Sequence, residues 1–162
     1  MRRALVLLYA LLIGGMLLGC QAVGGEKPLR SLPVISLQSL SQCGVSDPGL
    51  GWVRQLSELS VLPETLRLPV DRLTLDFTQH SLLVVYLGAQ PNTGYRLQRL
   101  ASEAPLLVGR LQVEVERITP KPGMMYAQMI TSPCLLLEIP KGDYSQIEVL
   151  DQHGVSLGIV SH

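Results

Sequence analysis

The sequence predicts a mostly β domain, a β-sandwich or small barrel of antiparallel strands, with one short helix near residues 51–59. Short apolar or alternating runs recur along the chain and are separated by Gly, Pro, Asn and Asp, which is typical of strands joined by turns. Only the segment from Gly51 to about Leu59 has apolar residues at helical spacing. The 162 residues carry 13 basic and 13 acidic side chains, so no basic excess indicates nucleic acid as a partner.

Residues 1–20 read MRRALVLLYALLIGGMLLGC and are predicted to be an export signal. Two arginines precede an apolar run over 4–18, which is shorter than the roughly 20 residues of a membrane-spanning helix. The end, Leu17-Leu18-Gly19-Cys20, resembles the lipobox of bacterial lipoproteins, in which the cysteine is acylated and becomes the first mature residue. The resemblance implies a lipid such as palmitate on Cys20 as the membrane anchor. An uncleaved anchor and an ordinary secretory signal with a chance cysteine are the alternatives.

The residue after this cysteine is Gln21 rather than aspartate. By the sorting rule of well-studied lipoproteins, this implies an outer-membrane location. The domain would then face the periplasm or the cell surface.

Two further cysteines, Cys43 and Cys134, remain in the 142 residues (162 − 20) that follow the signal. An oxidising compartment favours a disulfide between them. A catalytic thiolate on one of them and two unpaired thiols are the alternatives.

The chain from Gln21 to about Leu32 contains Gly24-Gly25 and Pro28 and is predicted to be a flexible tether. Residues 33–162 are then a single domain that begins with a strand over 33–41. Asp47-Pro48-Gly49 provides a capping signal for the helix over 51–59, on which Trp52 is expected to anchor the core, and Pro63 ends it.

Later strands are predicted over 81–88, 111–116, 134–139, 146–150 and 155–160. The run SLLVVYLG over 81–88 is continuously apolar, which favours a central strand buried on both faces. Residues 111–116 alternate, so their three apolar side chains should face a core while their acids face water. Gly154 ends a hairpin turn, Asp151 to Gly154, in which it is expected to take a positive φ.

Motifs of catalysis and metal binding are absent from the sequence. The three histidines, His80, His153 and His162, form no HExxH and no paired ligand spacing, and there is no CxxC. The sequence also lacks GxSxG, GxGxxG and a Walker loop. We therefore expect no enzyme, no catalytic residue, no metal and no cofactor other than the covalent lipid.

The segment Gly88-Ala89-Gln90-Pro91-Asn92-Thr93-Gly94-Tyr95 should connect the most apolar strand to a strand over 96–100. Pro91 fixes one φ, Asn92 and Thr93 can bond nearby backbone, and Gly94 permits a left-handed or otherwise forbidden conformation. Tyr95 has a ring to bury and a hydroxyl that needs a partner. The segment is either a rigid hairpin connection without a ligand or a pre-organised loop that presents itself to a protein partner.

The stretch from about Trp52 to Val149 resembles the protease complex subunit PrcB family. The matching pieces are a helix that bears the Trp, Leu75-Asp76-Phe77, Val84 to Gly88 leading into Pro91-x-Thr93-Gly94-Tyr95, Pro120-x-Pro122-Gly123, and Ser132-Pro133 before Leu135-Leu136-Leu137. Members are secreted or lipid-anchored bacterial proteins, and the namesake associates with an extracellular serine protease. The resemblance implies a non-enzymatic accessory role. The expected contact surface is the loop Pro91, Asn92, Thr93, Gly94 and Tyr95 with the turn of Pro120, Pro122 and Gly123, if the fold places them at the same end of the domain.

A narrower likeness links Gln90 to Tyr95 with the NPTTGY loop of chagasin-type cysteine protease inhibitors, which are β-sandwiches. The other two inhibitory loops of that family are not visible, and no Trp follows Trp52. The sequence thus predicts a non-enzymatic envelope lipoprotein that binds a protein partner, as an accessory subunit of a secreted or periplasmic protease complex. A direct protease inhibitor and a structural or assembly lipoprotein of the outer membrane are the alternatives.

Overall fold

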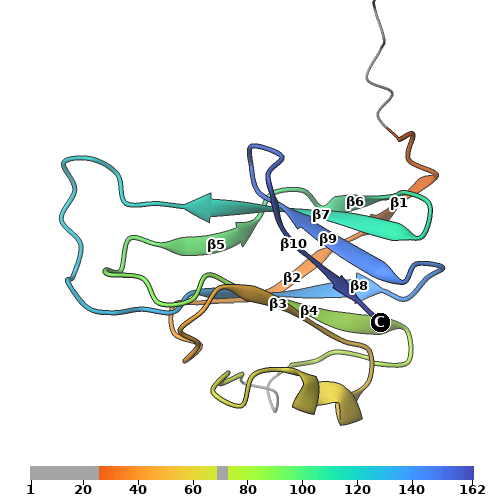
Figure 1. Cartoon of the computed structure of the whole chain (residues 1–162), viewed down its shortest axis with the longest axis horizontal. Helices are drawn as coiled ribbons and strands as arrows, with labels where there is room; N and C mark the ends of the chain where they lie inside the picture. The colour runs from red at the N-terminus through yellow and green to blue at the C-terminus, as the bar shows by residue number, and fades with distance from the viewer. Residues whose placement is uncertain (1–25, 69–72) are drawn as a thin grey trace, which may run out of the picture.

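A computed structural model describes residues 26–68 and 73–162 and shows two β-sheets packed face to face (Figure 1). Cys20, the signal and the first part of the tether lie outside the described residues. The larger sheet contains β1 (Arg30–Pro33), β5 (Arg96–Arg99), β6 (Glu103–Leu106), β7 (Arg110–Ile118), β9 (Gln146–Leu150) and β10 (Ser156–Ser161). The smaller sheet contains β2 (Ile35–Leu40), β3 (Gly49–Val53), β4 (His80–Tyr86) and β8 (Cys134–Pro140). The predicted mostly β class is confirmed, in the form of a sandwich.

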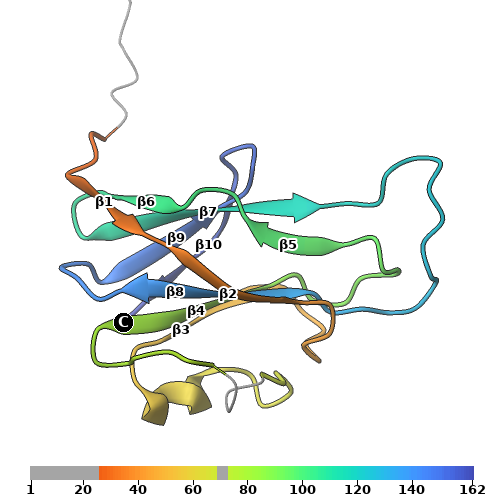
Figure 2. The same cartoon turned by 180° about the vertical axis from the view of Figure 1, so that it is seen from behind.

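The strand order is β1-β6-β7-β9-β10 in the larger sheet, with β5 also paired to β7, and β2-β8-β4-β3 in the smaller one. Pairing is antiparallel except between β7 and β9, which run parallel. β1 and β2 follow each other in the chain but belong to different sheets, and the buried Val34 separates them (Figure 2). No helix among residues 26–68 and 73–162 is long and apolar enough to cross a membrane.

The main core lies between the two sheets. Leu111, Val113 and Val115 of β7 point into it, as their alternation predicts. Leu83 and Val85 of β4 meet them from the smaller sheet. This packing fixes the sandwich because each sheet buries one apolar face.

A second cluster covers the outer face of the smaller sheet. Leu82 and Val84 of β4 belong to this cluster, as does Leu136 of β8. Leu62 and the partly buried Leu59 pack over them from the segment that follows β3. β4 is therefore buried on both faces, which confirms the prediction from its continuous apolar run.

The helix predicted over 51–59 is shifted and of a different type. Trp52 lies in β3, and the helix is a 3-10 helix, η1 (Leu56–Val61), without a buried residue. Residues 49–53 are extended because they pair with β4, and a Cβ on Gly51 would lie 2.1 Å from Leu62 Cδ2, so a larger residue there would displace the Leu62 side chain. Trp52 does anchor the core, where it is 5% exposed and stacks on Tyr144 at a centroid distance of 5.6 Å.

The ordered domain begins earlier than the sequence indicates. Residues 30–32, assigned to the tether, form most of β1 and pair with β6. Both are short strands that lack a clear alternating pattern, so their pairing depends on the rest of the sheet. The hairpin turn Asp151 to Gly154 is confirmed, with Gly154 at a φ of 74°.

Candidate partner-binding site

Two connections project together beyond one end of the sandwich (Figures 1 and 2). Residues 88–95 lie in the connection from β4 to β5, and residues 119–131 lie in the connection from β7 to β8. We call these two segments the tip, and the second one its arm. Their bases are joined by an isolated bridge, in which Gln90 N donates to Thr131 O at 2.7 Å and Thr131 N donates to Gln90 O at 2.9 Å.

The first segment turns sharply as it leaves β4. Gly88 has a φ of 72°, and a Cβ there would lie 2.6 Å from Ser46 O. Both the conformation and the close approach require glycine. The following amide, Ala89 N, donates to the same oxygen at 2.8 Å. The segment is thereby attached to the chain that precedes β3.

Asn92 organises the middle of this segment. Its Oδ1 accepts a hydrogen bond from Gly94 N at 2.9 Å, which is an Asx turn. Thr131 Oγ1 donates to Asn92 O at 3.1 Å, and Thr93 N donates to Ala127 O at 3.2 Å. The segment and the arm are thus held to each other by side-chain and backbone bonds.

Gly94 is required for a different reason from the one predicted. It does not have a positive φ. Instead, a Cβ there would lie 2.9 Å from Pro120 Cγ and 2.9 Å from Tyr126 Cδ1. The arm packs directly on the Gly94 backbone, a contact that sequence alone does not show. The structure therefore brings the Pro91–Tyr95 loop and Pro120 together.

The arm is folded by short-range hydrogen bonds of its own. Lys121 N donates to Tyr126 Oη at 3.1 Å, and Met124 N donates to Lys121 O at 3.3 Å. Gly123 lies in this turn with a φ of 78° and open space around its Cα. The arm is thus folded around the half-buried Tyr126.

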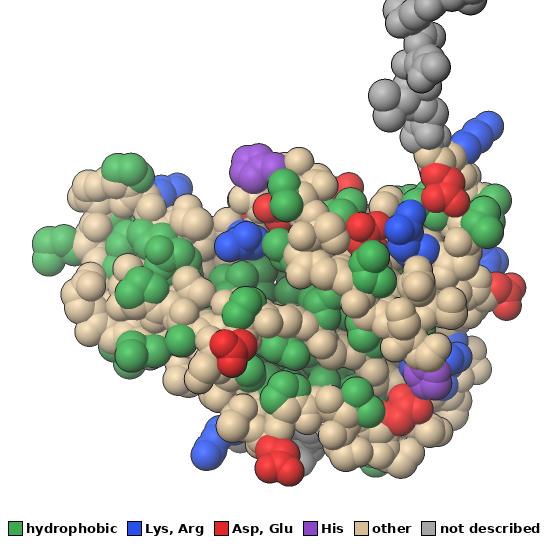
Figure 3. All heavy atoms as spheres, viewed as in Figure 1, with side chains coloured by type: hydrophobic (Ala, Val, Ile, Leu, Met, Phe, Trp, Pro, Cys, Tyr) green, Lys and Arg blue, Asp and Glu red, His purple; other side chains and the backbone are tan. Residues whose placement is uncertain are grey.

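The outer surface of the arm is apolar and exposed (Figure 3). Met125 is 98% exposed, Ile130 72%, Met124 60% and Met129 57%. Lys121 is the single charged residue in the two segments of the tip. Methionines adapt their shape to a partner and recur at protein-binding surfaces, so this composition is typical of a docking site.

These methionines were not identified from the sequence. They are all the methionines after residue 20, and they stand within six residues of one another. That concentration is the signal that could have found them. Of the predicted loop residues, Pro91, Thr93, Pro122 and Gly123 are exposed, and Tyr95 is half-buried directly before β5.

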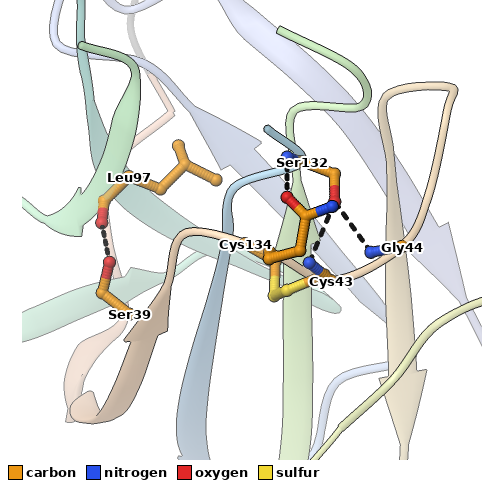
Figure 4. The surroundings of a disulfide bond; sticks show 7 residues. Ser39, Cys43, Gly44, Leu97, Ser132 and Cys134 are labelled. Atoms are coloured by element: carbon orange, nitrogen blue, oxygen red, sulfur yellow. Dashed lines mark hydrogen bonds between the residues drawn. A yellow bond between two sulfur atoms is a disulfide. The ribbon is translucent and has the colours of Figure 1, made fainter. Parts of the chain in front are cut away.

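A disulfide lies beside the base of the tip (Figure 4). The sulfurs of Cys43 and Cys134 are joined, with their Cα atoms 6.2 Å apart, as the cysteine count favours. Ser132 Oγ accepts hydrogen bonds from Cys43 N at 2.9 Å and Gly44 N at 2.7 Å. This network fixes the end of the arm, at Thr131 and Ser132, against the chain between β2 and β3.

In the part of the chain that the structure describes, neither a metal-ligand cluster nor a histidine lies at the tip. In the described ranges, no group of three or more His, Cys, Asp or Glu side chains could hold a metal ion. His80 and His153 lie away from the tip, in β4 and in the turn before β10. The apolar side chains and exposed backbone of the tip can bind a protein surface by burial and hydrogen bonding.

Comparisons with known proteins bear on this same part of the chain. No curated protein and no solved structure matches the sequence. The family model described as PrcB C-terminal matches residues 81–140. That range begins in β4 and ends in β8, so it includes the whole tip and is narrower than the resemblance seen over 52–149. Residues 81–140, which run from β4 through β8 and include the tip, are therefore of the PrcB C-terminal type.

Proposed function

We propose that this protein is a non-enzymatic envelope lipoprotein that binds a protein partner through its tip, as an accessory subunit of a protease complex. The observation that carries the proposal is the PrcB C-terminal match, which spans both connections of the tip. The resemblance to PrcB supplies the class of partner. The exposed apolar arm supports binding at that place.

The arm offers enough apolar surface for a specific contact. Burying a fully exposed methionine side chain is worth about 1.5–3 kcal/mol, and three methionines are available together with Ile130. The ordering cost is reduced because the arm is already folded around Tyr126 and bonded to the first segment. A preformed apolar surface of this kind favours binding without a large rearrangement.

The methionines also provide a direct test. Photo-methionine, which carries a diazirine, can be incorporated into the protein in the cells that produce it. Once a signal over residues 1–20 is removed, the label remains only at 124, 125 and 129, all within the arm. Irradiation should cross-link one recurrent polypeptide, and mass spectrometry should identify it as a protease or a subunit of a protease complex. Cross-linking to no polypeptide would contradict the binding proposal.

A variant with Gln in place of Met124, Met125 and Met129 tests the affinity for the cross-linked partner. Its binding should weaken at least tenfold because the apolar burial is lost. Val61→Gln is the matched control, since Val61 is 68% exposed in η1, away from the tip. Equal weakening by both variants would show that the arm is not the docking surface.

The membrane anchor is a separate part of the proposal and rests on the lipobox resemblance at Cys20. Cys20→Ser should release the protein from the membrane fraction. Release after this substitution supports lipidation, and continued retention contradicts it.

Direct inhibition of a protease is the second candidate function. It is favoured by the six-residue segment Gln90 to Tyr95, whose Asx turn holds it rigid at the projecting end. Excess purified protein should then reduce the activity of a cysteine or serine protease in proportion to occupancy. If a protease binds the tip and its activity is unchanged, the result contradicts inhibition and remains consistent with the accessory role.

A further inference from the structure

An open cleft of about 520 Å³ lies between the two sheets next to the tip. One wall is the start of β3, with Pro48, Gly49 and Leu50, and the other is the start of β10, with Val155, Ser156 and Leu157. Its volume is within the roughly 300–1,000 Å³ of typical binding pockets. Recessed apolar side chains are visible near the middle of the face that β10 crosses (Figure 3).

The walls of the cleft are the edges of two sheets. β3 is an edge strand of the smaller sheet, and β10 is an edge strand of the larger sheet. The sheets close on each other where Leu50 packs on Gly158, whose Cβ would lie 3.2 Å from Leu50 Cδ1. Beside that contact the cleft is open, so two strand edges face the same space. Strand edges bind extended peptides through main-chain hydrogen bonds.

The charge of the cleft has one sign. Arg117 is the single charged residue among the residues that line it. The backbone N and O of Arg117 are bonded to the Gln152 side chain, at 3.0 and 3.2 Å. The Asp151 carboxylate lies outside the cleft lining and accepts hydrogen bonds from His153 N and Val155 N, and the charge of Arg117 is close enough to contribute to the lowered pKa of that carboxyl. A ligand with a carboxylate would therefore complement the Arg117 guanidinium.

The geometry points to a peptide-binding cleft between β3 and β10. This cleft binds an extended apolar peptide segment, and a carboxylate of that peptide pairs with the guanidinium of Arg117. Apolar contacts come from Leu50, Val155 and Leu157. Leu50 O already accepts a hydrogen bond from Tyr86 Oη at 3.3 Å, and Val155 O accepts one from Asp151 N at 2.9 Å, so main-chain bonds to a peptide would use the other backbone groups of the two edges. Ala89 and Gln90 line the cleft and also belong to the first segment of the tip, so a polypeptide bound at the tip can continue into the cleft. This site goes beyond the docking role of the arm, which does not require it.

The test uses the full chain in detergent and a displayed library of random heptapeptides. Selected peptides should share apolar residues and one carboxylate, and replacing that carboxylate by its amide should weaken binding at least tenfold. Arg117→Gln should weaken peptide binding to a similar extent. The amide peptide should bind the Arg117→Gln variant no more weakly than either change alone allows, because both changes remove the same interaction. Methyl NMR signals of the cleft side chains should shift on titration with the peptide.

Arg30→Gln is the matched control, because Arg30 is an exposed arginine of β1, at the opposite edge of the larger sheet. It should leave peptide affinity unchanged. Ala89→Trp, which fills the cleft from an exposed position, should abolish binding. Peptides that bind the Arg117→Gln variant equally well, or an unaltered NMR spectrum of the cleft, would overturn the proposal. Competition by oleate with no peptide enrichment would also overturn it, in favour of a lipid ligand.

Discussion

Removing the Cys43–Cys134 disulfide should destabilise the protein strongly without changing its fold. The bond closes a separation of 91 residues. In the chain-entropy treatment, a loop of that length restricts the unfolded chain by about 4.6 kcal/mol at 25 °C. For the roughly 130 residues that are described, this corresponds to a fall in Tm of about 15 °C. The fold should persist because β2 remains paired with β8, and Ser132 still binds the Cys43 and Gly44 amides.

The assay compares urea unfolding of the Cys43→Ala/Cys134→Ala double variant with that of the parent chain, both with Cys20→Ser. Both cysteine side chains have no exposed surface, so substitution is a cleaner perturbation than reduction of the folded protein. A reducing agent added to the double variant is the control and should change nothing. A loss below about 1 kcal/mol would refute the loop-closure argument.

Three further predictions follow from the packing and the charges. Gly94→Ala should cost about 1–3 kcal/mol, measured by urea unfolding, because the new Cβ would lie 2.9 Å from two side chains of the arm; an unchanged midpoint would contradict this contact. Ser81→Ala should cost about 1–3 kcal/mol by the same measure, since the buried Trp52 Nε1 donates to Ser81 Oγ at 2.9 Å and would lose its acceptor; Ser81→Thr should retain more stability than Ser81→Ala. Backbone hydrogen bonds from His153 and Val155 lower the pKa of Asp151 below its ordinary 3.8, so its stabilising contribution is complete above that pH and is lost as the pH falls through the lowered pKa. Asp151→Asn should flatten the acid limb of the stability curve, and an identical limb would show that other carboxylates cause it.

The sequence predicts those strands in which the burial of each face is visible in the pattern of apolar residues. β7 alternates because one face meets the core and the other meets water, and that rule needs no knowledge of its partner strands. The sequence of β4 is continuously apolar because each face of the strand packs against an apolar cluster. The position of the Pro91–Tyr95 loop between two strands follows from the same patterns.

Other features depend on contacts between distant residues, which local spacing does not encode. Trp52 and Leu59 have helical spacing in the sequence. In the structure, however, Trp52 is part of β3 and pairs with β4, and Leu59 packs over the outer face of the smaller sheet. The packing of the arm on Gly94 likewise joins segments from two different connections. The cleft also arises from two strand edges that are far apart in the chain.

The disulfide has one more consequence, which concerns proteolysis. The arm, residues 119–131, lies inside the loop of chain that Cys43 and Cys134 close. A protease that cuts the exposed Met124–Met125 bond would divide the polypeptide, yet the two pieces would stay covalently joined through those sulfurs. β8 would also remain between β2 and β4. If the tip binds a protease, as proposed, the arm could in this way be cut without releasing either fragment from the other.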